Sequence, residues 1–125
     1  MTLGMNKVIL IGNVDGSVQY RPHEKGRHRL WFRLRTTEQR PDEDGVFRER
    51  LGWHTIVVWG ALAQTMNRYL RGETRVAIEG RLTTRKVTSA GASRWETEIH
   101  ARELILLDGP PSEGAMSPAS DPVAA

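Results

Sequence analysis

The sequence contains no cysteine, few aromatic residues and no long apolar segment. The absence of cysteine excludes disulfides and thiolate metal sites, and it suits a reducing cytoplasm. No apolar run approaches the roughly 20 residues that a membrane-spanning helix needs. Histidine and acidic residues are scattered without the spacing of a metal site, so we expect no metal.

Basic residues, most of them arginine, exceed the acidic ones and are confined to residues 1–108. All 18 basic residues lie in this range. Of the 15 acidic residues, Glu113 and Asp121 lie after residue 108, so residues 1–108 hold 18 basic and 13 acidic residues and carry a net charge of +5. This excess favours a polyanionic partner, although a solvated basic surface is the alternative. Residues 109–125 are rich in Pro, Gly, Ala and Ser, and we expect a disordered tail after a single domain at 1–108.

Alternating apolar and polar side chains predict five strands and one short helix. The expected strands are Met5 to Val14, Arg29 to Thr37, Trp53 to Trp59, Arg75 to Val87 and Arg94 to Leu107, and the expected helix is Ala61 to Leu70, closed by Gly72. Residues 15–26 and 38–52 are expected to be connections. The second contains the turn sequence PDEDG, so we expect the strands on either side of it to form a long hairpin. Three strands, a helix and two strands indicate an all-β OB-fold, a five-stranded Greek-key barrel.

The two faces of the third expected strand carry different side chains. Trp53, Thr55, Val57 and Trp59 share one face, and His54, Ile56 and Val58 share the other. The tryptophans either fill a core or offer flat rings to a ligand. Because Ile56 and Val58 make the better core face, we expect Trp53 and Trp59 to point outward. His54 is expected to be a hydrogen-bonded structural or interface residue.

The second expected strand alternates between Leu30, Phe32 and Leu34 facing the core and three residues facing outward. Trp31 is one of these three and shares its face with Arg33 and Arg35, which indicates a ligand contact, a rim position or a subunit contact. Trp95 either closes the core or contacts the ligand. The candidate phosphate contacts are Arg33, Arg35, Arg81, Arg85 and Lys86. Each of them alone is better explained as a solvated side chain, but as a set beside outward tryptophans they favour strand binding.

Several stretches together resemble the bacterial single-stranded DNA-binding protein family. These are MNKVILIGNV at 5–14, LWFRLRTTE at 30–38, WHTIVVWGALAQTMNRYL at 53–70, VAIEGRLTTRK at 76–86 and WETEI at 95–99. The resemblance implies an OB-fold, usually four such domains per assembly, and sequence-tolerant binding of single-stranded DNA. It implies no catalysis and no cofactor, and it places the protein in the cytoplasm with the nucleoid.

The family's stacking aromatics are carried over unevenly. Trp53 matches a stacking tryptophan, and Trp59 stands where the family usually has phenylalanine. Gln39 or Arg40, and also Val87, stand where the family has tryptophan, so Trp31 is a candidate for a relocated stacking residue. The sequence ends in SDPVAA. The family's acidic tip ending in Pro-Phe recruits replication and repair proteins, and we do not expect that route here.

Three functions compete at this stage. The first is coating of single-stranded DNA during replication, recombination or repair, with contacts from Trp31, Arg33, Arg35, Trp53, Trp59, Arg81, Arg85, Lys86 and Trp95. The second is a primosomal-type OB-fold adaptor that mainly docks replication proteins and binds strands weakly. The third, an OB-fold nuclease, needs clustered metal-binding carboxylates that the sequence does not offer, so we expect no enzyme. The resemblance implies a homotetramer, with a dimer as second choice, and a first strand that is apolar on both faces supports association.

Overall fold

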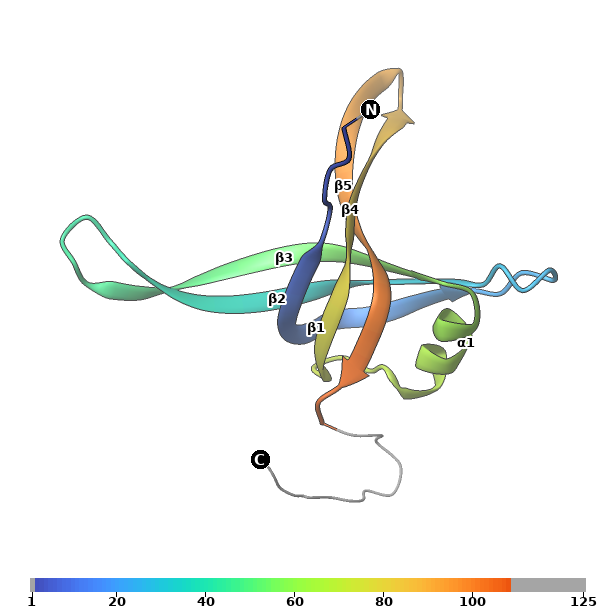
Figure 1. The fold of residues 1–125 in the computed structure, drawn as a ribbon, viewed down its shortest axis with the longest axis horizontal. Coiled ribbons are helices and arrows are strands. Elements are labelled where there is room, and N and C mark those ends of the chain that lie inside the picture. The colour runs from blue at the N-terminus through green and yellow to red at the C-terminus, as the bar shows by residue number, and fades with distance from the viewer. Residues whose placement is uncertain (1, 109–125) are drawn as a thin grey trace.

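The computed structural model describes residues 2–108, which form a closed barrel of five strands with one helix (Figure 1). The elements are β1 (Val8–Arg21), β2 (Arg29–Pro41), β3 (Phe47–Trp59), α1 (Gly60–Tyr69), β4 (Arg75–Ser89) and β5 (Ala92–Leu106). The strand order around the barrel is β1-β2-β3-β5-β4, and β3 pairs with β5 in parallel while the other pairs are antiparallel. The predicted OB-fold, with its helix between the third and fourth strands, is confirmed. The tail predicted for 109–125 lies outside the described residues.

The first strand extends further than predicted. The residues after Val14, which were expected to form a connection, still pair with β2. β1 continues to Arg21 after an irregularity in its pairing with β2 between Asp15 and Gln19. Gly16 lies within this irregularity at φ +78°, a conformation that glycine adopts without a Cβ penalty. The bulge lets the ladder resume, so the connection to β2 shrinks to residues 22–28.

The loop predicted at 38–52 is mostly an extension of the β2–β3 hairpin, which projects from the barrel as an arm (Figure 1). Pairing continues to Pro41 and Phe47, and only residues 42–46 turn. Asp42 closes this turn through backbone contacts to Gly45 and Val46, and its carboxylate pairs with Arg48 and Arg50. The arm lacks a continuous apolar face, so periodicity could not reveal it. The arm forms nonetheless, because backbone hydrogen bonds between β2 and β3 continue along it.

The core consists of the predicted inward side chains. Leu30, Leu34, Ile56 and Val58 are fully buried between β2 and β3, and Phe32 is nearly so. The helix lies one residue earlier than predicted and closes the barrel with Ala63, Met66 and the following Leu70.

Gly72 is not the C-terminal glycine that we expected. The positive φ after the helix belongs to Glu73, at 69°. Gly72 instead allows a close approach of two chain segments, because a Cβ there would lie 2.9 Å from the Gly16 carbonyl oxygen.

Candidate nucleic-acid interface

The two tryptophans of β3 point outward, as predicted. Trp53 and Trp59 are 46% and 45% exposed, whereas Ile56 and Val58 are completely buried. The period of two in a strand produces this separation, since the barrel interior takes the smaller branched side chains. Val57 shares the outward face with the tryptophans but is also fully buried. Neighbouring side chains therefore cover Val57, and the exposed indole rings lie on the same face of β3.

One row of side chains crosses this face from strand to strand. Trp31 on β2 is paired with Val57 on β3, Val57 with His100 on β5, and His100 with Arg81 on β4. Residues that are paired in neighbouring strands point to the same side of the sheet. The register thus aligns an indole, an imidazole and a guanidinium across the outer face. Trp59 follows two residues after Val57, on the same side.

Arg29 joins the two tryptophans and was missed by the sequence analysis. Its guanidinium carbon lies 4.3 Å from the ring centroid of Trp31 and 5.6 Å from that of Trp59. A guanidinium plane can stack on an aromatic ring, and it can also bind phosphate. The signal was present in the sequence, since Arg29 precedes Trp31 by two positions. Only the pairing of Arg29 with Trp59 across β2 and β3 shows that its guanidinium contacts both rings.

Trp53 borders a hollow of about 220 Å³ on the outer surface. Arg33 from β2, Leu82 from β4 and Thr97 from β5 line the same hollow. Arg33 is exposed. A flat ring, an exposed cation and an open cavity at one place are what a stacked base with its phosphate requires.

Trp59 borders two further hollows, of about 660 Å³ and 360 Å³. The larger is lined by Arg81, one of the candidate phosphate contacts, and also by Lys7, His100 and Arg102, which were not among the candidates. The smaller lies against Arg27 and Gly26 of the β1–β2 connection. The N-terminal segment is held beside the larger hollow by Asn6, whose side chain makes hydrogen bonds of 2.8 Å to the backbone oxygen and nitrogen of Leu82.

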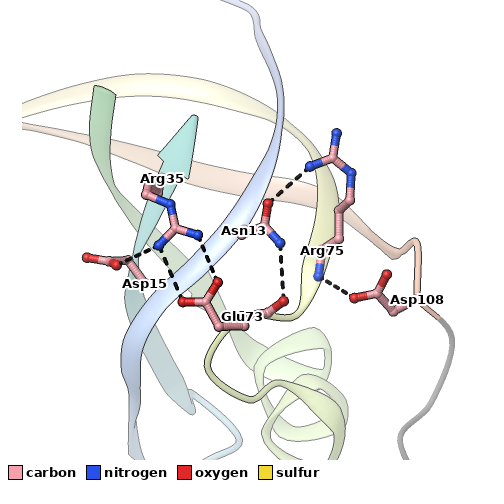
Figure 2. A network of polar contacts seen from close by, with 6 residues as sticks. All are labelled: Asn13, Asp15, Arg35, Glu73, Arg75 and Asp108. Atoms are coloured by element: carbon pink, nitrogen blue, oxygen red, sulfur yellow. Dashed lines mark hydrogen bonds and ion pairs between the residues drawn. The ribbon is translucent and has the colours of Figure 1, made fainter. Parts of the chain in front are cut away.

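Arg35 is paired with Trp53 across β2 and β3, but its guanidinium is turned to carboxylates. It makes contacts of 2.8 Å to Glu73 and 3.0 Å to Asp15 (Figure 2). The hydrogen bond and charge of Arg35 hold the pKa of Glu73 below its ordinary value. Asn13, Arg75 and Asp108 extend this network to the end of β5 (Figure 2). Arg35 therefore ties β1 and β2 to the turn before β4.

Arg85 and Lys86 are adjacent in β4, so the alternation of a strand directs them to opposite sides. Arg85 Nε donates a 2.7 Å hydrogen bond to Glu98, which is only 4% exposed. Lys86 is paired with Trp95 near the end of the β4–β5 hairpin. Trp95 is 68% exposed, which eliminates core closure for that residue. Alternation places Lys86 and Trp95 on the hairpin side that carries Leu82 and Thr97, beside the Trp53 hollow.

His54 has the structural role that we predicted. Its Nε2 lies 3.1 Å from Thr36 Oγ1, in a hydrogen bond between β3 and β2. Within residues 2–108, no group of three or more His, Asp or Glu side chains is arranged to hold a metal ion. No helix in this range is long and apolar enough to cross a membrane.

Residues 5–107 match the sequence model of the Single-strand binding protein family. Single-stranded DNA-binding protein 1 of Chlorobaculum tepidum is 38% identical over 122 residues, which cover 96% of this chain and 75% of that protein. Single-stranded DNA-binding protein of Xanthomonas axonopodis pv. citri is 36% identical over 110 residues, covering 87% of this chain and 61% of that protein. The chain thus spans less than two thirds of the Xanthomonas protein.

Solved structures show the same architecture. The Plasmodium falciparum SSB in complex with ssDNA superposes with a TM-score of 0.78 at 30% identity, over 86% of this chain and 99% of that one. The small single-stranded DNA-binding protein from Streptomyces coelicolor gives a TM-score of 0.65 at 24% identity, over 80% of this chain and 92% of that one. The second likeness is one of fold alone.

Proposed function

The chain belongs to the single-strand binding protein family, and from this premise we propose that it binds single-stranded DNA without marked sequence preference. The observation that carries the proposal is the outer face of β2 and β3, where Trp31, Trp53 and Trp59 stand beside Arg29 and Arg33. The relatives are named for this activity, and one of them is in complex with ssDNA. These comparisons favour strand binding over the primosomal-type adaptor.

Base stacking supplies the sequence-tolerant part of the binding. Each base stacked on a tryptophan contributes about 1–3 kcal/mol, and every base offers a ring face, so base identity matters little. We propose Trp53 and Trp59 as the main stacking residues, because each borders a hollow open to solvent. Trp31 and Trp95 extend the contact at either side.

Phosphate contacts supply the charge-dependent part. We propose Arg33, Arg81 and Lys86 as the main contacts among the predicted set, joined by Lys7, Arg29 and Arg102, all of which lie at the hollows or the rings. Arg35 and Arg85 belong to the predicted set as well. Their carboxylate partners neutralise part of their charge, so we assign them a weaker attraction for the strand.

A fluorescence titration tests this function. An oligothymidylate added to the full chain at low salt should quench tryptophan emission strongly, because the exposed indoles stack on bases. Each neutralised phosphate should steepen the fall of log K with log salt by about 0.7. Replacing Trp53 by Ala should weaken binding by about 1–3 kcal/mol. Absence of quenching at low salt would overturn the proposal.

We also propose that the chain assembles, as a homotetramer first and a dimer second. Ile9 and Ile11 on β1 are 66% and 52% exposed in the single chain, and Ile105 on β5 is 57% exposed. The sheet register aligns Ile11, Ala77 and Ile105 in one row across β1, β4 and β5. Such an apolar sheet face supports association, because leaving it in water is unfavourable.

The biological setting follows from this activity. We propose a role in coating and protecting strands during replication, recombination or repair, in the cytoplasm with the nucleoid, and without catalysis of its own. Incubation of single strands with the protein and magnesium tests the last point, and strand cleavage would contradict it.

A further inference from the structure

One chain of hydrogen bonds connects the outward tryptophan of β3 to a buried carboxylate. Trp59 Nε1 lies 3.4 Å from His100 Nδ1, and His100 Nε2 lies 3.1 Å from Glu98 Oε1. The other oxygen of Glu98 accepts the 2.7 Å hydrogen bond from Arg85 Nε. The proposed stacking function uses none of Glu98, His100 or this connection between them.

Glu98 is the ionised group at the buried end of these hydrogen bonds. Burial acts to raise the pKa of Glu98, but hydrogen bonds from Arg85 and His100 and the charge of Arg85 outweigh it, so the pKa lies below its ordinary value. An ionised carboxylate only accepts hydrogen bonds. His100 must therefore carry a proton on Nε2 to satisfy Glu98.

The hydrogen on Nε2 determines what Nδ1 can do. In a neutral imidazole, one nitrogen donates and the other accepts. With Nε2 protonated, Nδ1 has a free lone pair, and the indole N–H of Trp59 is a donor only. The two rings meet with centroids 6.1 Å apart and planes at 53°, which is an edge contact that leaves the indole free to stack elsewhere.

We propose that His100 is a positioning residue for Trp59, oriented by Glu98 so that its Nδ1 accepts the indole N–H and holds the ring ready for a base. The inference rests on the proposed function. Its consequence is that a variant without an acceptor at the position of Nδ1 binds less well through Trp59.

The charged groups around His100 come from three segments. They are Glu98 and Arg102 on β5, Glu79 and Arg81 on β4, and Lys7 before β1, with Arg85 behind Glu98. β3 presents Val57 and Trp59 to this side, neither of which titrates. Because Lys7, Arg81 and Arg102 are cations that attract phosphate, the total affinity does not isolate the contact with the indole. The coupling between His100 and Trp59 is therefore the quantity to measure.

A double-mutant cycle measures that coupling. The full chain, His100→Gln, Trp59→Phe and the double variant are titrated with an oligothymidylate in one buffer. Phenylalanine keeps a stacking ring but removes the N–H, and glutamine places its amide where Nε2 stands, so it can still donate to Glu98. His100→Gln should weaken binding by about threefold to tenfold in the presence of Trp59 and have little effect in the Trp59→Phe background.

A matched variant separates positioning from folding. His100→Asn places an oxygen near the position of Nδ1 and removes the donor to Glu98, so it should keep more of the coupling with Trp59 than His100→Gln does. Thermal unfolding of each variant reports its stability independently of DNA. Additive costs in the cycle, or the same coupling for His100→Gln and His100→Asn, would overturn the inference while leaving strand binding intact. Loss of binding in the unmodified chain would overturn the proposed function itself.

Discussion

Arg85 and the buried Glu98 form an ion pair in which one partner is half in water and the other is almost completely covered. The side chain of Arg85 is 52% exposed and that of Glu98 only 5%. Removing the arginine therefore leaves a covered carboxylate without its shortest hydrogen bond. The neighbouring Lys86, which points to the other side of β4, has no such role.

Replacing Arg85 and Lys86 separately tests this difference between the two adjacent basic residues. Arg85→Gln should lower the free energy of unfolding by about 1–3 kcal/mol, the cost of an unsatisfied covered group. Lys86→Gln should leave the stability within about 0.5 kcal/mol and reduce the salt dependence of DNA binding. Urea unfolding and an oligothymidylate titration measure the two effects. Equal loss of stability in both variants would contradict the assignment.

The same pair predicts how stability responds to acid. The pKa of Glu98 is lower in the folded chain than its ordinary value, so the folded state gains stability above the range where the unfolded carboxyl titrates. That gain is lost as the pH falls through the folded pKa. The stability advantage of the native chain over Glu98→Gln should be greatest near neutral pH and shrink under acid. Urea unfolding at about pH 7 and about pH 3 tests this, and an unchanged difference would count against it.

Arg29 should bind the strand as well as contact the indoles. When a base approaches Trp31 or Trp59, the guanidinium between them can turn to a phosphate. Arg29→Gln should then weaken binding and reduce the salt slope by about 0.7, the value for one phosphate on a single strand. Arg68→Gln, on the exposed side of α1, is the matched control and should change neither. The test fails if both variants have the same slope as the unmodified chain.

Gly80 should tolerate no side chain. A Cβ at this position would lie 2.2 Å from the carbonyl oxygen of His100, at the irregularity between Glu79 and Gly80 in the β4–β5 pairing. Backbone would have to move, so Gly80→Ala should lose about 1–3 kcal/mol of stability. It should also weaken DNA binding through displacement of His100. Gly4→Ala, which meets nothing within 4 Å, should be neutral. Denaturant unfolding compares the two.

The exposed isoleucines should decide assembly. Ile11→Lys places a charge in the apolar row that Ile11 forms with Ala77 and Ile105, and it should convert the assembly to smaller species in solution, since burying a charge among apolar side chains is unfavourable. Light scattering coupled to size exclusion measures the mass. Leu51→Lys, on the exposed β2–β3 arm, is the control and should leave the mass unchanged. A native chain that is already monomeric at micromolar concentration would contradict the proposed assembly.

Predictions from periodicity succeeded where each strand has one core face. Leu30, Phe32 and Leu34 were expected inside and are buried, and the outward direction of Trp53 and Trp59 followed from the burial of Ile56 and Val58. Strand ends were predicted less well. The arm beyond Thr37 has no apolar alternation. In β1 beyond Val14, only Val18 and Tyr20 alternate, after the irregularity that begins at Asp15, so neither extension was predicted from the local pattern.

Contacts between residues far apart in the sequence could not be predicted from local patterns either. Arg35 and Arg85 were grouped with Arg33 and Arg81, because all four are arginines on expected strands. The fold brings Glu73 to the first and Glu98 to the second, from other parts of the chain. Arg29 and His100 were not selected at all, since their value depends on the neighbours that β3 and β5 provide.

The sequence by itself determined the order of the elements, the barrel's core and the side of the sheet on which the tryptophans stand, because these follow from the period of two along single strands. Only the tertiary structure decided which cations face the rings, which are held by carboxylates, and that Trp59 meets His100. Those relationships depend on strand register and barrel closure, which join residues far apart in the chain and leave no mark in the neighbouring residues.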